Sequence, residues 1–399
     1  MKKPSLKSLS IVEFLKQEPR REARIAAAPA APMPPMESYV ANRLCAALHP
    51  ARQFVKVAEV IERGETVRSY RVVADPARGT ESLAYFSAGQ YLSVSLKVGN
   101  ATLTRPYSIS SSPKEALQGW YELTVKRAPH GLASNYILDN WTVGTEVEVS
   151  APEGLFTYEP LRDAPTVVGI AGGSGITPFV SLAKAVADGD EDFNLELLYG
   201  CTHEKDILFR KELDEIAAKC PRVHVTYVLS ADNAEGCEEG HLSAERIRAR
   251  APEGEYSVFI CGSQGLYRYF DTQLPLLGLR RKFIRRELFG EYRDPSADEG
   301  YVAPKEDTCS VTVLLRGETY TFTAPVEDTL LVSIEKQGIP APAKCRSGEC
   351  GWCRARLVSG EVYIPASVDG RKLADHDYGY IHPCCTFPLG DVVLEISAK

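Results

Sequence analysis

The pattern of hydrophobic and polar positions divides most of the chain into three segments. Between residues 52 and 160, apolar and polar residues alternate with a period of two in short runs such as VKVAEVIE, VRSYRVVAD and YLSVSLKV. This alternation places every second side chain on one face of a sheet, and turn residues separate the runs. We therefore predict an all-β unit here, a β-barrel.

The pattern changes between residues 161 and 292. Short continuous apolar runs (TVVGIAG, FNLELLYG, VHVTYVLS and YSVFICG) alternate with longer amphipathic stretches such as ITPFVSLAKAVADG and RKELDEIAAKC. Apolar runs of this length are typical of strands buried on both faces, and the intervening stretches have the spacing of helices. The segment is predicted to be a doubly wound α/β domain with a parallel sheet.

The remaining segments are a linker, a C-terminal domain and an N-terminal extension. Residues 293–306 are polar and contain Pro and Gly, whereas the chain beyond them opens with alternating strands. Near the N-terminus, the Ala/Pro-rich stretch AAAPAAPMPPM separates a weakly amphipathic start from the helical pattern ESYVANRLCAALHP. The predicted organisation is a multidomain α+β protein with five parts: 1–51, 52–160, 161–292, 293–306 and 307–399.

Composition and charge exclude several classes of protein. The chain has 399 residues, of which 44% are hydrophobic and 25% charged, which suits several globular domains. Its formal net charge is -7 and it has no long basic run, so we expect no nucleic-acid partner. No apolar stretch reaches the ~20 residues of a membrane helix, and the N-terminus lacks a secretory h-region. Eleven cysteines are an odd number for a disulfide framework, so we expect a reducing cytoplasm.

Three of these cysteines lie close together in PAPAKCRSGECGWCRARLVSG. Cys345, Cys350 and Cys353 have the C-x4-C-x2-C spacing of plant-type [2Fe–2S] sites, which use a distant fourth cysteine. Glycines within this loop allow the backbone N–H groups to approach the negatively charged cluster. The fourth ligand is Cys384 or Cys385, since no other cysteine follows. A structural zinc site is the alternative, although such sites usually have paired C-x2-C arms.

This C-terminal segment, including HPCCTFPLGDVVLEI, resembles the plant-type ferredoxin domain over its whole length. The resemblance implies a β-grasp fold. In that family the last ligand lies four residues before a proline, which implies Cys384, because Pro388 follows it. Cys385 stays open as an alternative.

Two motifs in the barrel segment, TRPYSISS and HGLASNYI, resemble the flavin motifs of the ferredoxin–NADP reductase superfamily. The resemblance implies that Arg105 holds a flavin phosphate, that Tyr107 lies against the isoalloxazine and that Ser108 hydrogen-bonds near flavin N5. Gly131 and Ser134 would begin a short helix whose N-terminal amides meet the pyrophosphate. Further flavin contacts would come from Pro106, Val125, Lys126 and Leu132.

The stretch VVGIAGGSGITPFVSLAKAV is a strand, a glycine-rich turn and a helix. Gly172, Gly173 and Gly175 allow a dinucleotide to approach the backbone closely. The form Gly-Gly-x-Gly-x-x-Pro, together with the later YSVFICGSQG, also resembles the reductase superfamily. The resemblance implies that Cys261 lies near the nicotinamide, where it would join Tyr107 and Ser108 at the reacting atoms, and that Thr177 faces the flavin. Pro178 and Gly262 would complete the nucleotide contacts.

Two cofactor choices remain at this stage. The acidic stretch LSADNAEGCEEG, with Asp232, would repel the extra phosphate of NADPH and favours NADH, whereas Arg210 and Lys211 keep NADPH open. The turn from Gly131 to Ser134 resembles the FAD-binding version and not the FMN one. The stretch RRELFGE resembles FAD-containing oxygenase reductases and flavohaemoglobin reductases, which would place Glu287 and Phe289 near the flavin. Both residues are alternatively ordinary strand residues at the domain's edge.

The order of the three resemblances implies an electron-transfer route. Electrons would pass from NAD(P)H to FAD, then singly to the [2Fe–2S] cluster and on to a partner protein, such as an oxygenase, a hydroxylase or a hybrid-cluster protein. The cofactors carry the chemistry, and the protein supplies position and electrostatics. The alternatives are a non-catalytic electron-transfer subunit of a larger complex and a redox sensor with the same cofactors.

Overall fold

The computed structural model describes residues 11–28, 34–99, 101–129, 131–288 and 290–397. The chain divides into two compact units, Met1–Ala47 and Leu48–Lys399. In the first unit, α1 (Ile11–Ala27) extends into the Ala/Pro-rich stretch that was predicted to be a spacer. The predicted second helix is present as α2 (Val40–Leu48), which ends at the boundary between the units.

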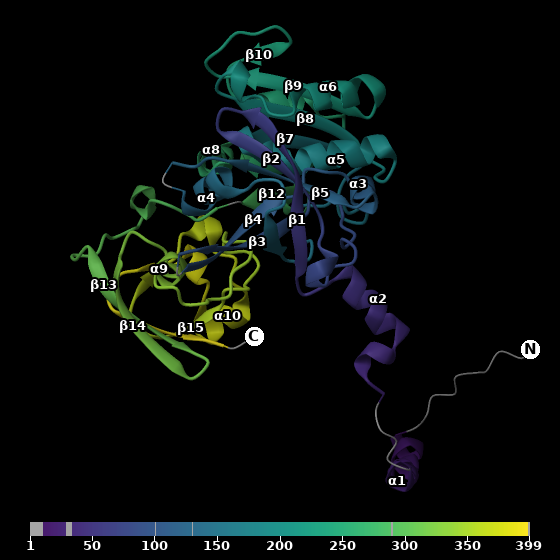
Figure 1. Cartoon of the computed structure of the whole chain (residues 1–399), viewed down its shortest axis with the longest axis vertical. Coiled ribbons are helices and arrows are strands. Elements are labelled where there is room, and N and C mark those ends of the chain that lie inside the picture. The colour runs from purple at the N-terminus through teal and green to yellow at the C-terminus, as the bar shows by residue number, and fades with distance from the viewer. Residues whose placement is uncertain (1–10, 29–33, 100, 130, 289, 398–399) are drawn as a thin grey trace, which may run out of the picture. The chain divides into compact units, whose positions relative to one another are not determined.

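The first sheet of the second unit is antiparallel and curls into a barrel (Figure 1). Its strand order is β4-β3-β6-β1-β2-β5, and a bridge between Ile109 and Leu123 connects the end of β4 to the far edge strand. The small helix α3 (Pro113–Leu117) precedes β5, and α4 (Leu132–Asn140) contributes Ile137 to the barrel core. The strands are β1 (Gln53–Gly64), β2 (Val67–Ala74), β3 (Tyr91–Val98), β4 (Ala101–Ser108), β5 (Trp120–Lys126) and β6 (Glu146–Val149).

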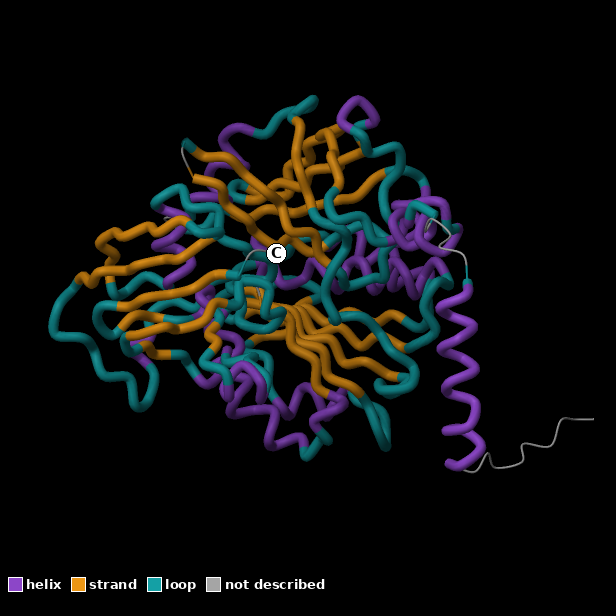
Figure 2. Tube along the Cα trace, turned by 90° about the horizontal axis from the view of Figure 1, so that it is seen from below, coloured by secondary structure: helices purple, strands orange, loops and turns teal. Residues whose placement is uncertain are grey.

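The second sheet is parallel, in the order β10-β9-β8-β7-β11-β12. One hydrophobic core lies on each of its faces, and Figure 2 shows helices on both sides of a twisted group of strands. The strand order reverses between β7 and β11, and such a switch point is where open α/β sheets bind their ligands. The elements are β7 (Thr166–Gly172), α5 (Thr177–Asp188), β8 (Asn194–Cys201), α6 (Arg210–Lys219), β9 (Val223–Leu229), β10 (Cys237–Glu239), α7 (Ala244–Arg250), β11 (Ser257–Gly262), α8 (Gln264–Gln273) and β12 (Ile284–Leu288).

The C-terminal domain is a mixed sheet in the order β14-β13-β19-β15-β17, with a separate β16–β18 pair. Leu330 and Ile334 of α9 pack into the core of this sheet, as in a β-grasp fold. The loop between α9 and β15, residues 337–354, carries three of the predicted ligand cysteines and is called the cluster loop below. The elements are β13 (Thr308–Leu315), β14 (Glu318–Pro325), α9 (Leu330–Lys336), β15 (Ala355–Ser359), β16 (Val362–Tyr363), α10 (Leu373–Asp377), β17 (Tyr380–Ile381), β18 (Phe387–Pro388) and β19 (Val392–Ile396).

The predicted fold class is confirmed, because a curled antiparallel sheet, a doubly wound parallel sheet and a β-grasp sheet follow one another along the chain. In the part of the chain that the structure describes, no helix has both the length and the apolar character needed to cross a bilayer.

Candidate functional site

The four predicted ligand cysteines come together as two pairs of thiols. Cys345 and Cys350 share a side-chain hydrogen bond, and Cys353 shares one with Cys384. Cys350 is exposed, whereas the other three are buried. A [2Fe–2S] cluster has two irons and four cysteine ligands, so each pair suits one iron.

Cys384 and its neighbour Cys385 share a side-chain hydrogen bond, but their other partners differ. The thiol of Cys385 donates a hydrogen bond to the carbonyl oxygen of His382, at a distance of 3.4 Å. Among the described residues, no three His, Cys, Asp or Glu side chains are gathered as around a single metal ion. Since a binuclear cluster places sulfides between its irons, two separate thiol pairs fit it. The assignment of Cys384 stays a prediction.

The backbone of the cluster loop surrounds the ligand sulfurs with donors. The N–H of Cys350 donates to Sγ of Cys345, and the N–H of Trp352 donates to Sγ of Cys350, both at 3.4 Å. Hydrogen bonds from Cys350 and Ser347 lower the pKa of Cys345, which favours the thiolate that binds iron. Gly348 has a φ of +83°, and a Cβ there would lie 2.0 Å from the carbonyl oxygen of Val368. Glycine is therefore required at this turn.

The predicted flavin residues lie on β4 and at the start of α4. Ser108 is buried, and its hydroxyl finds no hydrogen-bond partner among the described residues. An unpaired buried hydroxyl is costly, so this one fits a polar atom of a bound flavin. Gly131 caps the N-terminus of α4, and Ser134 accepts a hydrogen bond from the N–H of Ala128. Of the remaining predicted flavin residues, Val125 and Pro106 are buried, Tyr107 is half-buried, and Lys126 and Leu132 are exposed.

Arg105 has partners that the sequence analysis did not anticipate. Its guanidinium lies 3.1 Å from a carboxylate oxygen of Glu291 and 3.3 Å from one of Glu335. The same two carboxylates pair with Arg346, whose side chain is fully buried in the cluster loop. These four residues, called the four-charge cluster below, connect the barrel, the segment after β12 and the ferredoxin domain.

The predicted nucleotide residues surround a cavity of about 850 Å³ at the switch point of the parallel sheet. Gly172, Gly173 and Gly175 line it from one side, and Cys261 and Gly262 line it from the other. Gly175 packs against the end of β11, because a Cβ there would lie 2.2 Å from the carbonyl oxygen of Cys261. The glycine turn therefore brings the two strand ends together.

The first turn of α5 follows directly from this glycine turn. Thr177 begins the helix, and its hydroxyl donates a hydrogen bond to the carbonyl oxygen of Ser174 at 3.1 Å. Pro178 occupies the first turn, where its missing N–H leaves no intrahelical bond unmade. Both residues are buried, and neither is among the described residues that line the cavity.

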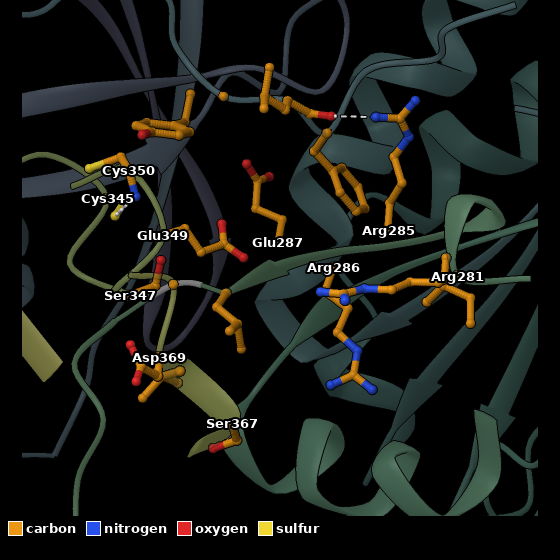
Figure 3. A pocket seen from close by; sticks show the side chains of 18 of the residues that line it. Arg281, Arg285, Arg286, Glu287, Cys345, Ser347, Glu349, Cys350, Ser367 and Asp369 are labelled. Carbon is orange, nitrogen blue, oxygen red and sulfur yellow. Dashed lines mark hydrogen bonds between the residues drawn. The ribbon is translucent and has the colours of Figure 1, made fainter. Parts of the chain in front are cut away.

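Glu287 lies between the nucleotide cavity and the cluster loop. It pairs with Cys261 across the β11–β12 ladder, and Figure 3 shows Glu349 extending from the cluster loop toward it. Glu287 is buried, and its Oε2 has no hydrogen-bond partner among the described residues. Burial, and to a lesser degree the charge of Glu349, raise the pKa of Glu287 well above its ordinary value. Phe289, predicted beside it, lies outside the described residues.

Two features of the site escaped the sequence analysis. The four-charge cluster includes an ion pair between residues 230 positions apart, so no local sequence pattern predicts it. Glu349 stands between the predicted ligands Cys345 and Cys350, and the sequence analysis assigned it no role. Its position next to Cys350 is the signal that could have drawn attention to it.

Comparison with known proteins agrees with this geometry. The family model for an oxidoreductase FAD-binding domain matches residues 77–158, that for an oxidoreductase NAD-binding domain matches 170–272, and that for a 2Fe-2S iron-sulfur cluster binding domain matches 313–389. The 3-ketosteroid-9-alpha-monooxygenase ferredoxin reductase component of Rhodococcus rhodochrous is 31% identical over 353 residues, covering 86% of this chain and 96% of that protein. The chain belongs to the ferredoxin–NADP reductase superfamily, in the group with a C-terminal [2Fe–2S] domain.

Further relatives match along most of their length. The glycine betaine monooxygenase reductase subunit of Chromohalobacter salexigens is 27% identical over 360 residues, covering 86% of this chain and 95% of that protein. The solved structure of phthalate dioxygenase reductase has the same fold, with a TM-score of 0.63 at 23% identity, and covers 86% of this chain and 98% of that one.

Membership of this superfamily identifies the cofactors and the reaction class. The protein is an NAD(P)H-dependent oxidoreductase that passes electrons through FAD to a [2Fe–2S] cluster. The matches decide against zinc and FMN as alternatives. The roles of individual residues stay predictions, and the paired thiols and the unpaired hydroxyl of Ser108 are the observations that fit them.

The buried carboxyl of Glu287 leads to a prediction about pH. The folded protein keeps this carboxyl protonated at a pH where the unfolded chain, with a glutamate pKa of about 4.3, has ionised. Stability is therefore lost as the pH rises above that value, by about 1.4 kcal/mol per pH unit until the folded pKa is reached. Glu287→Gln should raise the unfolding midpoint at pH 8, and the gain should shrink toward pH 5.

Thermal unfolding of the FAD-loaded protein at pH 5, 6.5 and 8 measures this effect. Glu239→Gln, at an exposed carboxylate, is the matched control and should show no such trend. A gain for Glu287→Gln that is the same at every pH would show that the folded protein does not hold the proton.

Proposed function

We propose that this chain is the reductase component of an oxygenase system, which oxidises NADH and delivers electrons one at a time to a separate oxygenase component. The observation that carries the proposal is the position of Glu287. It lies beside Cys261, which lines the nucleotide cavity, and it faces Glu349 of the cluster loop. The predicted hydride site and the predicted cluster are thus neighbours within one unit of the structure.

The electron count defines what the partner must accept. Each NADH gives up a hydride, which is two electrons and one proton, and becomes NAD⁺. FAD, when bound, accepts the hydride and supplies the conversion from a two-electron to a one-electron reaction. The proton from the hydride passes to solvent, and two single electrons reduce two equivalents of a one-electron acceptor. Ser108 would orient the flavin, and the thiol pairs would hold the cluster that hands on each electron.

NADH, and not NADPH, is proposed as the donor. Asp206 and Ser230 line the nucleotide cavity from the parallel sheet, where an acidic side chain opposes a 2′-phosphate, whereas Lys126 and Arg127 line it from the barrel. Arg210, which kept NADPH open, pairs with Glu204 and is not among the described residues that line the cavity. Asp232 accepts hydrogen bonds from His203 and the N–H of Glu204, and it is not among the described residues that line the cavity, whereas Asp206 is. Asp206 therefore replaces Asp232 as the acidic residue that supports the choice.

The kind of partner is proposed from the relatives. The Rhodococcus rhodochrous and Chromohalobacter salexigens proteins are named as reductase components of monooxygenases, and this chain covers 95% or more of each. A further relative, at 28% identity over 311 residues, is the NADH oxidoreductase HCR of Escherichia coli. We place the reaction in the cytoplasm, because ligand thiols must stay reduced until they bind iron. All cysteines of the described chain are free.

Steady-state kinetics of the purified chain tests the reductase. We expect two cytochrome c reduced per NADH, and kcat/KM for NADH about tenfold or more above that for NADPH, a difference of about 1.4 kcal/mol. Tight FAD and cluster binding without turnover would instead indicate an electron-transfer subunit or a sensor.

The oxygenase assignment needs a reconstituted system. Product should form when the chain, NADH, oxygen and the oxygenase component of a 3-ketosteroid-9α-monooxygenase or a glycine betaine monooxygenase are combined with the substrate. If the chain reduces cytochrome c and a hybrid-cluster protein but supports neither oxygenase, the assignment is wrong.

A further inference from the structure

A short basic segment borders a large cleft beside the cluster loop. Residues 280–286 read RRKFIRR, with five basic side chains and no acidic one, in a chain whose net charge is -7. The cleft has a volume of about 1390 Å³ and is lined by Arg281, Lys282 and Arg286 on one wall. Cys345 and Cys350 line the opposite wall (Figure 3).

The basic side chains of this cleft are not all neutralised. Arg281 and Lys282 are exposed, as is Arg162, which reaches the cleft from the chain before β7. Within the described part of the chain, none of these three forms an ion pair with a carboxylate. Arg162 instead donates a hydrogen bond to the carbonyl oxygen of Lys282, which keeps the cations together.

Three of the five carboxylates that line the cleft form ion pairs, and a fourth, Glu287, is buried with a raised pKa. The fifth, Glu349, belongs to the cluster loop on the opposite wall, where the charge of Lys372 acts on it. Arg162, Arg281 and Lys282 are therefore three positive charges without an ion-pair partner among the described residues. The three ion pairs are Glu153 with Lys344, Asp271 with Arg286 and Asp369 with Arg371.

We propose that this cleft is the docking site of the electron acceptor, and that it receives an acidic surface of the acceptor protein against Arg162, Arg281 and Lys282. This inference rests on the proposed function, since it requires an acceptor outside the chain. Docking here would bring the acceptor's redox centre to Cys350, the exposed one of the four predicted ligands. Complementary charge raises the rate of productive encounter and selects among partners.

The nucleotide does not need this cleft. The glycine turn and Cys261 line a separate cavity at the switch point of the sheet, and that cavity contains none of the three basic residues. A protein acceptor, in contrast, needs an open surface next to the cluster loop, and this cleft provides one.

The test reverses charge at two exposed residues, Arg281→Glu and Lys282→Glu together, and uses two protein acceptors of opposite charge. With cytochrome b5, which is acidic, kcat/KM at low ionic strength should fall by about tenfold or more, within the range that steering supplies. With cytochrome c, which is basic, it should not fall. The difference should largely disappear at about 0.5 M salt. Reduction of the flavin and of the cluster by NADH should stay unchanged in stopped-flow measurements.

The matched control carries the same change of charge elsewhere. Lys97 on β3 and Lys219 at the end of α6 are exposed and line none of the cavities described above. Lys97→Glu with Lys219→Glu should leave cytochrome b5 reduction unchanged. An equal loss in the control, or no loss in the cleft variant, would overturn the proposal. So would a changed KM for NADH or a changed oligomeric mass in the cleft variant, because the cleft would then serve a nucleotide or a second copy.

Binding measurements separate this inference from the proposed function. Calorimetry with oxidised cytochrome b5 measures binding to the cleft without electron transfer. The affinity of cytochrome b5 for the cleft variant should be about tenfold weaker than for the unmodified protein. If NADH fails to reduce the cluster in the unmodified protein, the proposed function is wrong. The loss of binding would still establish the docking surface, and unchanged binding would refute it.

Discussion

Replacing Cys350 with serine should remove the [2Fe–2S] cluster from the purified protein and leave the reduction of FAD by NADH intact. Cys350 lies in the cluster loop, whereas Cys261 and the glycine turn belong to the parallel sheet. We expect the rate of cluster-dependent cytochrome c reduction to fall more than ~100-fold. Even the mutation of a residue that only supports a metal ligand lowers metal affinity or activity by about 10- to 100-fold. Iron analysis, visible absorption and stopped-flow reduction of the flavin measure the outcome.

Two further serine variants make this experiment sharper. Cys384 and Cys385 are adjacent and share a side-chain hydrogen bond, but Cys384 also shares one with Cys353, whereas Cys385 donates to the carbonyl oxygen of His382. Cys384→Ser should therefore lose the cluster, and Cys385→Ser should keep it. The reverse result would make Cys385 the fourth ligand. Loss of flavin reduction in a folded, FAD-loaded Cys350→Ser protein would contradict a sequential route.

The features that could be predicted from the sequence are those that depend on neighbours along the chain. Gly348 and Gly175 are needed because the backbone passes within contact distance of Val368 and Cys261, and such turns leave a local signature. The spacing of the ligand cysteines is local in the same way, and so is the period of the strands. Resemblance to a known superfamily then assigned cofactors to these local patterns.

The features that escaped prediction depend on tertiary contacts. Arg285 forms a buried ion pair with Asp163, which is 122 positions away, and no periodicity connects the two. Asp206 was overlooked in favour of Asp232, because which of two acidic residues reaches a cavity depends on how the strand ends are arranged. Arg346 directly follows Cys345 and no sequence pattern marks it, yet its side chain is fully buried. Such residues acquire their roles from partners that folding brings to them.

The four-charge cluster is where these tertiary contacts concentrate. Arg346 donates hydrogen bonds to Glu291 at 2.8 Å and to Glu335 at 2.6 Å, and Arg105 lies close to both carboxylates. Burial opposes the charge of Glu291, but Arg346 and Arg105 lower its pKa, so that the carboxylate stays ionised. Two positive and two negative charges therefore offset one another where the barrel meets the cluster loop.

Removing one member of the four-charge cluster should lower the free energy of unfolding far more than breaking an exposed ion pair does. In Arg346→Met the two carboxylates lose their buried partner, and breaking a buried pair in this way typically costs about 3–5 kcal/mol. Arg356→Met, the matched control, breaks an exposed pair with Glu395 in the same domain and should cost at most about 1 kcal/mol. Loss of the cluster's visible absorption with increasing urea measures both variants.

The same variant should also slow the step from FAD to the cluster, because Arg346 connects the cluster loop to Glu291 and Glu335, and both carboxylates pair with Arg105 of the barrel. A misplacement of the reacting groups by about 1 Å can lower a reaction rate about 100-fold. We therefore expect the rate of cluster reduction to fall roughly 10- to 100-fold. Hydride transfer should be unaffected in stopped-flow traces of the FAD-loaded variant, since the nucleotide cavity contains no member of the four-charge cluster. The FAD content is measured beforehand, because Arg105 of this cluster is also the predicted partner of a flavin phosphate. Arg346→Lys, which keeps a positive charge, should recover part of the rate. If Arg346→Met slows both steps equally, the four-charge cluster stabilises the fold without positioning the cluster loop.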